Sequence, residues 1–131
     1  MEPVMTIQTP VARAVIETYL QCGPNRARDE LLALFAPDAT FEDPVGGEVL
    51  VGHDAIGGFF DAIMAADSIE MTLDENFVRV AGDSVAFGFT AKVTFGDMTT
   101  TVSPIDVFEF DDQGLIRSMR SYWSPDDMTI G

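Results

Sequence analysis

The spacing of apolar residues changes near Ser68, and this change constrains the fold more than any other feature of the sequence. Before it, apolar side chains recur every three or four residues, as in amphipathic helices. After it, they alternate with small or polar residues, as on a strand with one buried face; the clearest run is Val85, Phe87, Phe89, Ala91, Val93 and Phe95. Helices followed by strands favour an α+β domain in which helices pack on one face of a curved antiparallel sheet.

Three helices are expected in the first half of the chain. The first covers about residues 9–22 behind a Thr-Pro start signal, and its apolar stripe turns Tyr19 inward. The second covers about 26–35 and ends at Ala36-Pro37-Asp38. The third covers about 54–65, with an apolar stripe made of Ile56, Phe59, Phe60, Ile63 and Met64.

Turn signals divide the second half into four strand segments. They lie at Ala81-Gly82-Asp83, at Gly96-Asp97 and at residues 111–114, a spacing typical of consecutive antiparallel hairpins. The sequence contains no repeat and no linker-like change of composition. We therefore expect one domain over residues 1–131, with residues 1–8 flexible.

The charge of the chain excludes several classes of partner. With 22 acidic and 7 basic residues, the formal net charge is −15. Nucleic acids and anionic membrane surfaces are recognised by clustered cations, so neither is an expected partner. Disorder is not expected either, because 47% of the residues are hydrophobic and ten are Phe.

The inventory of reactive residues argues against a metal or cofactor. Cys22 is the only cysteine, so the chain can form neither an intramolecular disulfide nor a thiolate metal cage, and a reducing compartment is expected. His53 is the only histidine, and no phosphate loop or dinucleotide motif is present. The N-terminus lacks a cationic start, and no apolar run approaches the ~20 residues of a membrane span. We expect a soluble, cytoplasmic protein without a bound cofactor.

Asp106 is the first residue whose position indicates chemistry. Between residues 102 and 110 the even positions are Val102, Pro104, Asp106, Phe108 and Phe110, so alternation puts a carboxyl group on an otherwise apolar face. A buried, unpaired carboxyl group has a raised pKa and stays protonated, which makes it a hydrogen-bond donor. The alternative is a twist or bulge at Pro104 that lets Asp106 reach water.

Three further residues have both a functional and an ordinary interpretation. Asp43 shares a strand face with Phe41 before a Pro/Gly turn, but Asp-Pro is also a common way to begin a turn. The hydroxyl of a buried Tyr19 needs a hydrogen-bond partner, which a ligand could supply, but Tyr19 could also be an ordinary core tyrosine. Trp123 either caps a pocket or closes the core.

Taken together, these residues resemble the ketosteroid isomerases, or steroid Δ-isomerases, of the nuclear transport factor 2-like and SnoaL-like superfamily. The resemblance runs from the first helix to Trp123. It is carried by Tyr19 within Glu17-Thr18-Tyr19-Leu20, by Asp38-Ala39-Thr40-Phe41-Glu42-Asp43-Pro44-Val45-Gly46, by Pro104-Ile105-Asp106-Val107-Phe108-Glu109-Phe110 and by Met119-Arg120-Ser121-Tyr122-Trp123. The tyrosine together with the Pro-Ile-Asp strand is its most selective part.

The resemblance implies a cone-shaped fold of three helices against a curved sheet, and a homodimer joined through the outer sheet face, with Ile105 and Val107 contributing. It also implies isomerisation of Δ5-3-ketosteroids to Δ4-3-ketosteroids, with Asp43 as general base and with Tyr19 and a protonated Asp106 as the oxyanion hole. The ketosteroid isomerases are themselves the established example of a neutral carboxylic acid in that role, so this assignment comes from the resemblance. The apolar walls around a neutral steroid would be formed by Phe59, Phe60, Phe87, Phe89, Met119 and Trp123.

One feature departs from the family. Its bacterial members support the oxyanion tyrosine with further tyrosines, and the corresponding positions here are Phe60 and Phe35. Two other functions use the same cone: a SnoaL-type aldol cyclase acting on a polyketide ester, and a binding module for steroids or other hydrophobic ligands without turnover. Epoxide hydrolysis of the limonene type fits less well, because no inward Asp-Arg-Asp set is present.

Overall fold

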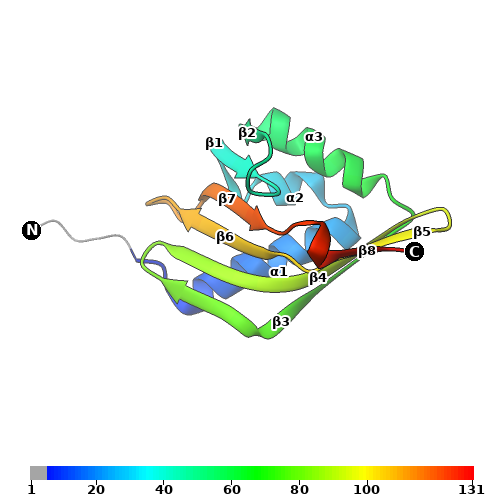
Figure 1. The fold of residues 1–131 in the computed structure, drawn as a ribbon. Coiled ribbons are helices and arrows are strands. Elements are labelled where there is room, and N and C mark those ends of the chain that lie inside the picture. Colours follow the sequence, from blue (N-terminus) through cyan, green and yellow to red (C-terminus); the bar gives the residue numbers. More distant parts are fainter. Residues whose placement is uncertain (1–5) are drawn as a thin grey trace, which may run out of the picture.

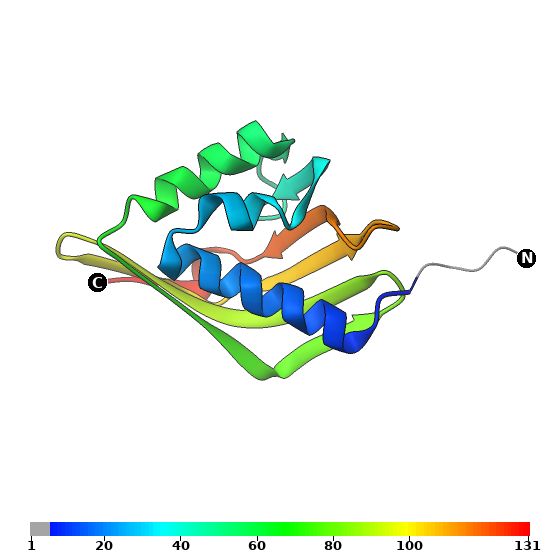
Figure 2. The ribbon, with the colours of Figure 1, turned by 180° about the vertical axis from the view of Figure 1, so that it is seen from behind.

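The computed structural model describes residues 6–131. Three helices are present: α1 (Thr9–Asn25), α2 (Arg28–Leu32) and α3 (His53–Met64). All three lie on the same side of a strongly curved sheet, and within the described residues the opposite face of that sheet carries no helix (Figure 1; Figure 2). The α+β architecture predicted from the change of periodicity is confirmed.

The sheet contains eight strands and is mixed. Its strands are β1 (Phe35–Glu42), β2 (Val49–Val51), β3 (Ser68–Ala81), β4 (Ser84–Phe95), β5 (Met98–Val102), β6 (Ile105–Phe110), β7 (Ile116–Tyr122) and β8 (Met128–Ile130). A 3₁₀ turn, η1 (Pro125–Asp127), precedes β8. The order is β2-β1-β7-β6-β4-β5-β8, with β3 paired to β4.

Three hairpins in the second half, β3–β4, β4–β5 and β6–β7, form where the turn signals predicted them. Gly82 and Gly96 occupy the β3–β4 and β4–β5 turns with φ of +57° and +59°, values that favour glycine. The prediction of a purely antiparallel sheet is wrong in one place, because β1 pairs with β7 in parallel. Alternation within single segments carries no signal for this pairing, because the two strands are separated by most of the chain.

The second helix is shorter than predicted. It ends at Leu32, and Phe35 already belongs to β1, where it pairs with Ile116. Ala36 precedes Pro37, and a residue before proline disfavours helical backbone, so the chain is extended from this point on. The apolar run that includes Phe35 therefore serves a buried strand instead of a helix.

The start of the chain is attached to the sheet from Ile7 onward. Ile7 is buried, and its N–H donates to the carbonyl oxygen of Gly82 at 2.9 Å. The predicted flexibility concerned residues 1–8, of which residues 1–5 lie outside the described residues. Among residues 6–131, no helix is long and apolar enough to cross a membrane.

The core lies between the helices and the inner face of the sheet. Tyr19 of α1 reaches across to Phe87 of β4 and Phe108 of β6, with ring centroids 6.4 and 5.1 Å apart in edge-to-face geometry. Aromatic pairs of this kind contribute about 1 kcal/mol beyond their buried area. This packing fixes α1 above the middle of the sheet, and Tyr19 with it.

Candidate active site

Tyr19 lies in an aromatic surrounding on the inward side of α1. It is 5% exposed, and besides Phe87 and Phe108 its ring meets that of Phe60 at 6.0 Å, edge to face. Burial raises the pKa of Tyr19 well above its ordinary value, and the charges of Asp106 and Asp43 raise it further. The phenol therefore stays protonated at neutral pH and is available as a hydrogen-bond donor.

Asp43 lies just beyond the end of β1 and is half-buried. The indole Nε1 of Trp123 donates to its Oδ1 at 2.6 Å. Burial raises the pKa of Asp43, and the hydrogen bond from Trp123 acts against this rise. Because the indole can only donate, this contact favours the ionised carboxylate, which is the form that can accept a proton.

Asp106 lies on the buried face of β6, as alternation predicted. It is 1% exposed, and so the alternative in which a bulge at Pro104 exposes it is wrong. Burial raises the pKa of Asp106 to about 8; a hydrogen bond with Ser121 lowers it, and the charge of Asp43 raises it. At neutral pH the group is mainly a neutral carboxylic acid.

Tyr19 and Asp43 line one apolar cavity of about 140 Å³ on the inner side of the sheet. Six of the residues predicted for the site line it, and they are Tyr19, Asp43, Phe59, Phe60, Phe89 and Trp123. Asp106 lies just behind the wall: Pro104, on the same face of the chain, and Ser121, opposite it on β7, both line the cavity. The three groups are close enough that the charges of Asp43 and Asp106 raise the pKa of Tyr19, and the charge of Asp43 raises that of Asp106.

Two residues predicted as walls do not line the cavity. Phe87 and Met119 are fully covered, with 1% and 0% of their surfaces exposed. Phe87 stacks on Phe89 at 5.6 Å and lies under Tyr19, so its neighbours separate it from the open space. Met119 pairs with Phe41 and Phe108 in the middle of the sheet.

The remaining lining residues were not predicted, and they are Ile63, Met71, Ala91, Val93, Val102, Pro104 and Ser121. The alternation of side chains along a strand could have predicted several of them, because residues two apart lie on the same face. Ala91 and Val93 follow Phe89 on one face of β4, and Ser121 precedes Trp123 by two residues. Met71 belongs to β3, and no part of its local pattern connects it to the site.

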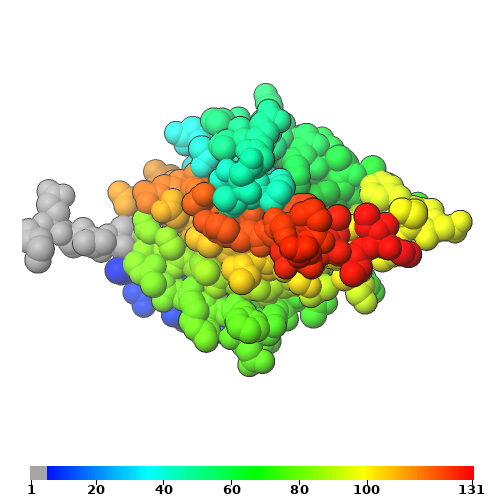
Figure 3. Space-filling model, in the orientation of Figure 1, coloured from blue at the N-terminus to red at the C-terminus, as the bar shows by residue number. Residues whose placement is uncertain are grey.

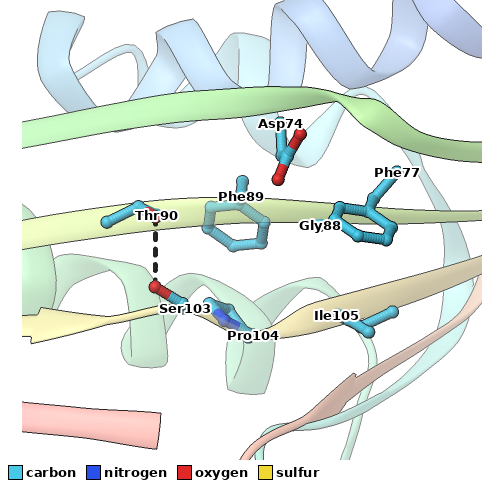
Figure 4. Close-up of a pocket in the computed structure, with 8 residues that line it drawn as sticks. All are labelled: Asp74, Phe77, Gly88, Phe89, Thr90, Ser103, Pro104 and Ile105. Carbon is cyan, nitrogen blue, oxygen red and sulfur yellow. Dashed lines mark hydrogen bonds between the residues drawn. The ribbon is translucent and has the colours of Figure 1, made fainter.

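A larger hollow of about 260 Å³ lies on the other face of the sheet (Figure 4). Gly88 has no side chain to fill it, and Phe77 projects from β3 beside it. The hydroxyls of Thr90 and Ser103 form a hydrogen bond of 3.1 Å at one end of this hollow. Of the residues that line it, Asp74 alone carries a carboxyl group, and Tyr19, Asp43 and Asp106 are not among them.

The inner cavity has a proton acceptor, Asp43, and a proton donor, Tyr19, on its wall, and a second donor, Asp106, lies behind that wall. A carboxylate beside a neutral acid and a phenol in apolar surroundings can remove a proton next to a carbonyl group. The negative charge that develops on the carbonyl oxygen can then be stabilised by the donors.

Comparison with known proteins shows the family to which the chain belongs. Residues 16–119 match the family model described as a SnoaL-like domain. A steroid Δ-isomerase from Nocardioides simplex is 37% identical over 118 residues, which are 90% of this chain and 94% of the relative.

Solved structures give the same result. RV0760c from Mycobacterium tuberculosis has a TM-score of 0.84 at 30% identity, over 97% of this chain and all of the other. The same protein has been solved in complex with estradiol-17β-hemisuccinate, with a TM-score of 0.81 at 30% identity over 91% of this chain and 98% of the other. The Δ5-3-ketosteroid isomerase from a Mycobacterium species has a TM-score of 0.82 at 26% identity, over 92% of this chain and 98% of the other.

Proposed function

Because the chain belongs to the SnoaL-like domain family and is a homologue of steroid Δ-isomerase, we propose that it converts Δ5-3-ketosteroids to the conjugated Δ4 isomers. The reaction moves a proton from C4 to C6 through a dienolate, whose negative charge lies on the C3 oxygen. It requires a base that both accepts and returns a proton, together with donors for that oxygen.

Asp43 is the proposed base. Its carboxylate removes the proton at C4, the electrons move through the dienolate, and the same proton returns at C6. Burial raises the pKa of Asp43, which strengthens it as a base, while Trp123 keeps the carboxylate in its ionised form. Proton transfer of this kind contributes a factor of about 10² to 10⁴ to the rate.

Tyr19 and Asp106 are the proposed donors to the C3 oxygen. Both are protonated at neutral pH for the same reason, which is burial. In apolar surroundings each donor stabilises the developing charge by about 3 kcal/mol. Phe60 and Phe35 replace the tyrosines that, by the resemblance, would donate hydrogen bonds towards Tyr19. The Tyr19 ring instead packs edge to face against the ring of Phe60.

The observation that carries the proposal is the contrast between the two carboxyl groups. Asp43 is half-buried beside a pure donor, whereas Asp106 is buried in the core with a pKa of about 8. When the surroundings give two carboxyl groups different pKa values, one is ionised and the other protonated at the same pH. Such a pair provides one base and one acid.

The walls support a neutral, hydrophobic substrate. The lining residues include Phe59, Phe89 and Trp123 and no Lys or Arg. The volume of about 140 Å³ is below the ~300–1,000 Å³ of typical pockets for drug-sized ligands. We infer that it encloses the ring that carries the ketone, while the other rings lie in the mouth.

We also propose a homodimer formed through the outer face of the sheet. Among residues 6–131 no helix covers this face (Figure 1), which Figure 3 shows from outside, and Ile105, Phe77 and Tyr122 on it are 49%, 59% and 43% exposed. An apolar surface of this kind is typical of an interface between copies. Sedimentation should give a dimer mass, and Ile105→Asp should give a monomer; a monomeric wild type would contradict the proposal.

An ultraviolet assay for conjugated enone formation from 5-androstene-3,17-dione tests the proposed activity. We expect turnover by the wild type and strong losses for Asp43→Asn and Asp106→Leu. No turnover together with tight binding of the phenolic steroid equilenin would instead support a steroid-binding module. Neither turnover nor binding would direct the search to an aldol cyclase acting on a polyketide ester.

A further inference from the structure

Asp106 and Ser121 are the two polar side chains, tyrosine apart, that are buried within residues 6–131. Each is 1% exposed. They lie directly opposite each other on β6 and β7, and such cross-strand neighbours have Cβ atoms about 5 Å apart on the same face. The hydroxyl of Ser121 lies within hydrogen-bonding reach of the carboxyl group of Asp106, whose pKa it lowers, and Ser121 lines the inner cavity.

The carboxyl group of Asp106 has one oxygen without a partner. Its Oδ1 is buried and has no hydrogen-bond partner among residues 6–131. A neutral carboxylic acid offers one O–H donor and one carbonyl acceptor. Whichever oxygen accepts from Ser121 serves as the carbonyl, and so the acidic proton is kept on the other.

The other groups around Asp106 do not supply this function. Phe87, its neighbour on β4, is apolar. Tyr19 on α1 and Asp43 beyond β1 are the titratable groups whose charges couple to Asp106. Asp43 can only disfavour a second negative charge, and Tyr19 points its hydroxyl at the same substrate oxygen in the proposed reaction.

We propose that Ser121 is a positioning residue for Asp106: by donating a hydrogen bond to one carboxyl oxygen, it keeps the acidic proton on the other, ready for a ligand carbonyl in the cavity. The identity of that ligand rests on the proposed function, whereas the effect on the free protein does not.

The backbone of Ser121 forms a hydrogen bond that does not involve its hydroxyl. The role of the hydroxyl can therefore be tested by itself. Its carbonyl oxygen accepts from the N–H of Val45 at 2.8 Å and so holds the segment that follows Asp43. Ser121→Ala keeps this bond and removes only the hydroxyl. Ser118→Ala is the matched control, because Ser118 lies on the same strand but on the opposite face, across from Glu109.

The test is a pH titration of the Asp106 carboxyl carbon by ¹³C NMR in the ligand-free protein, with the resonance assigned by its loss in Asp106→Asn. A hydrogen bond to a carboxylate is stronger than one to the neutral acid, so removing the Ser121 hydroxyl disfavours ionisation. We expect the midpoint in Ser121→Ala to move upward by roughly one pH unit. Ser118→Ala should titrate like the wild type, and Ser121→Thr should restore the wild-type midpoint.

An unchanged midpoint in Ser121→Ala, or an equal change in Ser118→Ala, would overturn the proposal. A role in packing alone would lower the melting temperature of Ser121→Ala without moving this midpoint. The turnover assay is a separate readout: at pH 6 Asp106 is protonated in both proteins, and kcat should fall several-fold in Ser121→Ala with little change in KM. If the midpoint moved in Ser121→Ala but the wild type showed no isomerase activity, the role of Ser121 would be supported. The proposed function would be contradicted.

Discussion

Trp123 holds Asp43 through a hydrogen bond of 2.6 Å between its indole Nε1 and the carboxylate Oδ1. Ser121, two residues earlier on the same face of the chain, contacts Asp106. The end of β7 therefore presents one donor to each of the two carboxyl groups. Their different protonation states follow from burial, which is complete for Asp106 and partial for Asp43.

The hydrogen bond from Trp123 should set the lower pH limit of activity. It lowers the pKa of Asp43 against the effect of burial, so Trp123→Phe should raise that pKa. Since the base must be ionised to accept a proton, the acid limb of the kcat/KM profile should move to higher pH. The measurement is this profile between pH 3 and pH 7.

Tyr122→Phe provides the comparison for Trp123→Phe. Tyr122 is the preceding aromatic residue, is 43% exposed and faces the other side of the sheet. Its replacement should leave the acid limb unchanged. If both variants moved the limb equally, the hydrogen bond to Asp43 could not be the cause.

Removing the base should abolish most of the turnover and leave binding intact. Asp43→Asn keeps the shape of the side chain and can still accept from Trp123, but an amide cannot take up a proton at C4. We expect kcat to fall by about 10² to 10⁴ and the affinity for equilenin to stay within a few-fold of wild type. Stopped-flow ultraviolet kinetics and fluorescence titration measure the two quantities; wild-type turnover in the variant would exclude Asp43 as base.

Local periodicity was sufficient to predict the fold class and the burial of Asp106. The even positions of β6 share one face, and Asp106, Phe108 and Phe110 are all buried. The same argument could not predict the parallel pairing of β1 with β7, since strand alternation does not specify a distant partner. For the same reason the contact between Trp123 and Asp43, 80 residues apart, has no signature in either segment.

Periodicity was also insufficient to separate the walls of the cavity from the core behind them. Phe87 and Phe89 share a face of β4, yet only Phe89 lines the cavity. The difference arises because Tyr19 and Phe108 cover Phe87 from two other elements. Alternation identifies which face is buried, whereas the position of α1 over that face decides which residues meet the open space.

Asp106 should set the upper pH limit of activity. Its pKa is raised to about 8, so above this pH it loses the proton that it donates. The kcat/KM profile of the wild type, which reports the groups of the free enzyme, should therefore decline near pH 8. Asp106→Asn keeps a donor that does not titrate, and its profile should lack this decline; a decline that persisted in Asp106→Asn would assign the limb to another group.

Eliminating the donor should cost more than replacing it. Asp106→Leu removes the hydrogen bond to the C3 oxygen, and kcat should fall by about 10² to 10³. Asp106→Asn should retain more activity than Asp106→Leu at pH 6. Equal rates for the two variants would show that Asp106 does not act as a donor.

The same carboxyl group should make the stability of the protein depend on pH, in a direction opposite to that of a salt-bridged aspartate. Its pKa is raised on folding from 3.8 to about 8, so between these values the native state binds more protons than the unfolded state. The contribution to stability is then complete below about pH 4, decreases as the pH rises towards 8, and is constant above it. Relative to Asp106→Asn, which does not titrate, the wild type should lose several kcal/mol of unfolding free energy over this range. Urea unfolding of both proteins at pH 5, 7 and 9 measures the difference, and parallel pH dependences would mean that Asp106 is not the buried neutral acid that the proposed oxyanion hole requires.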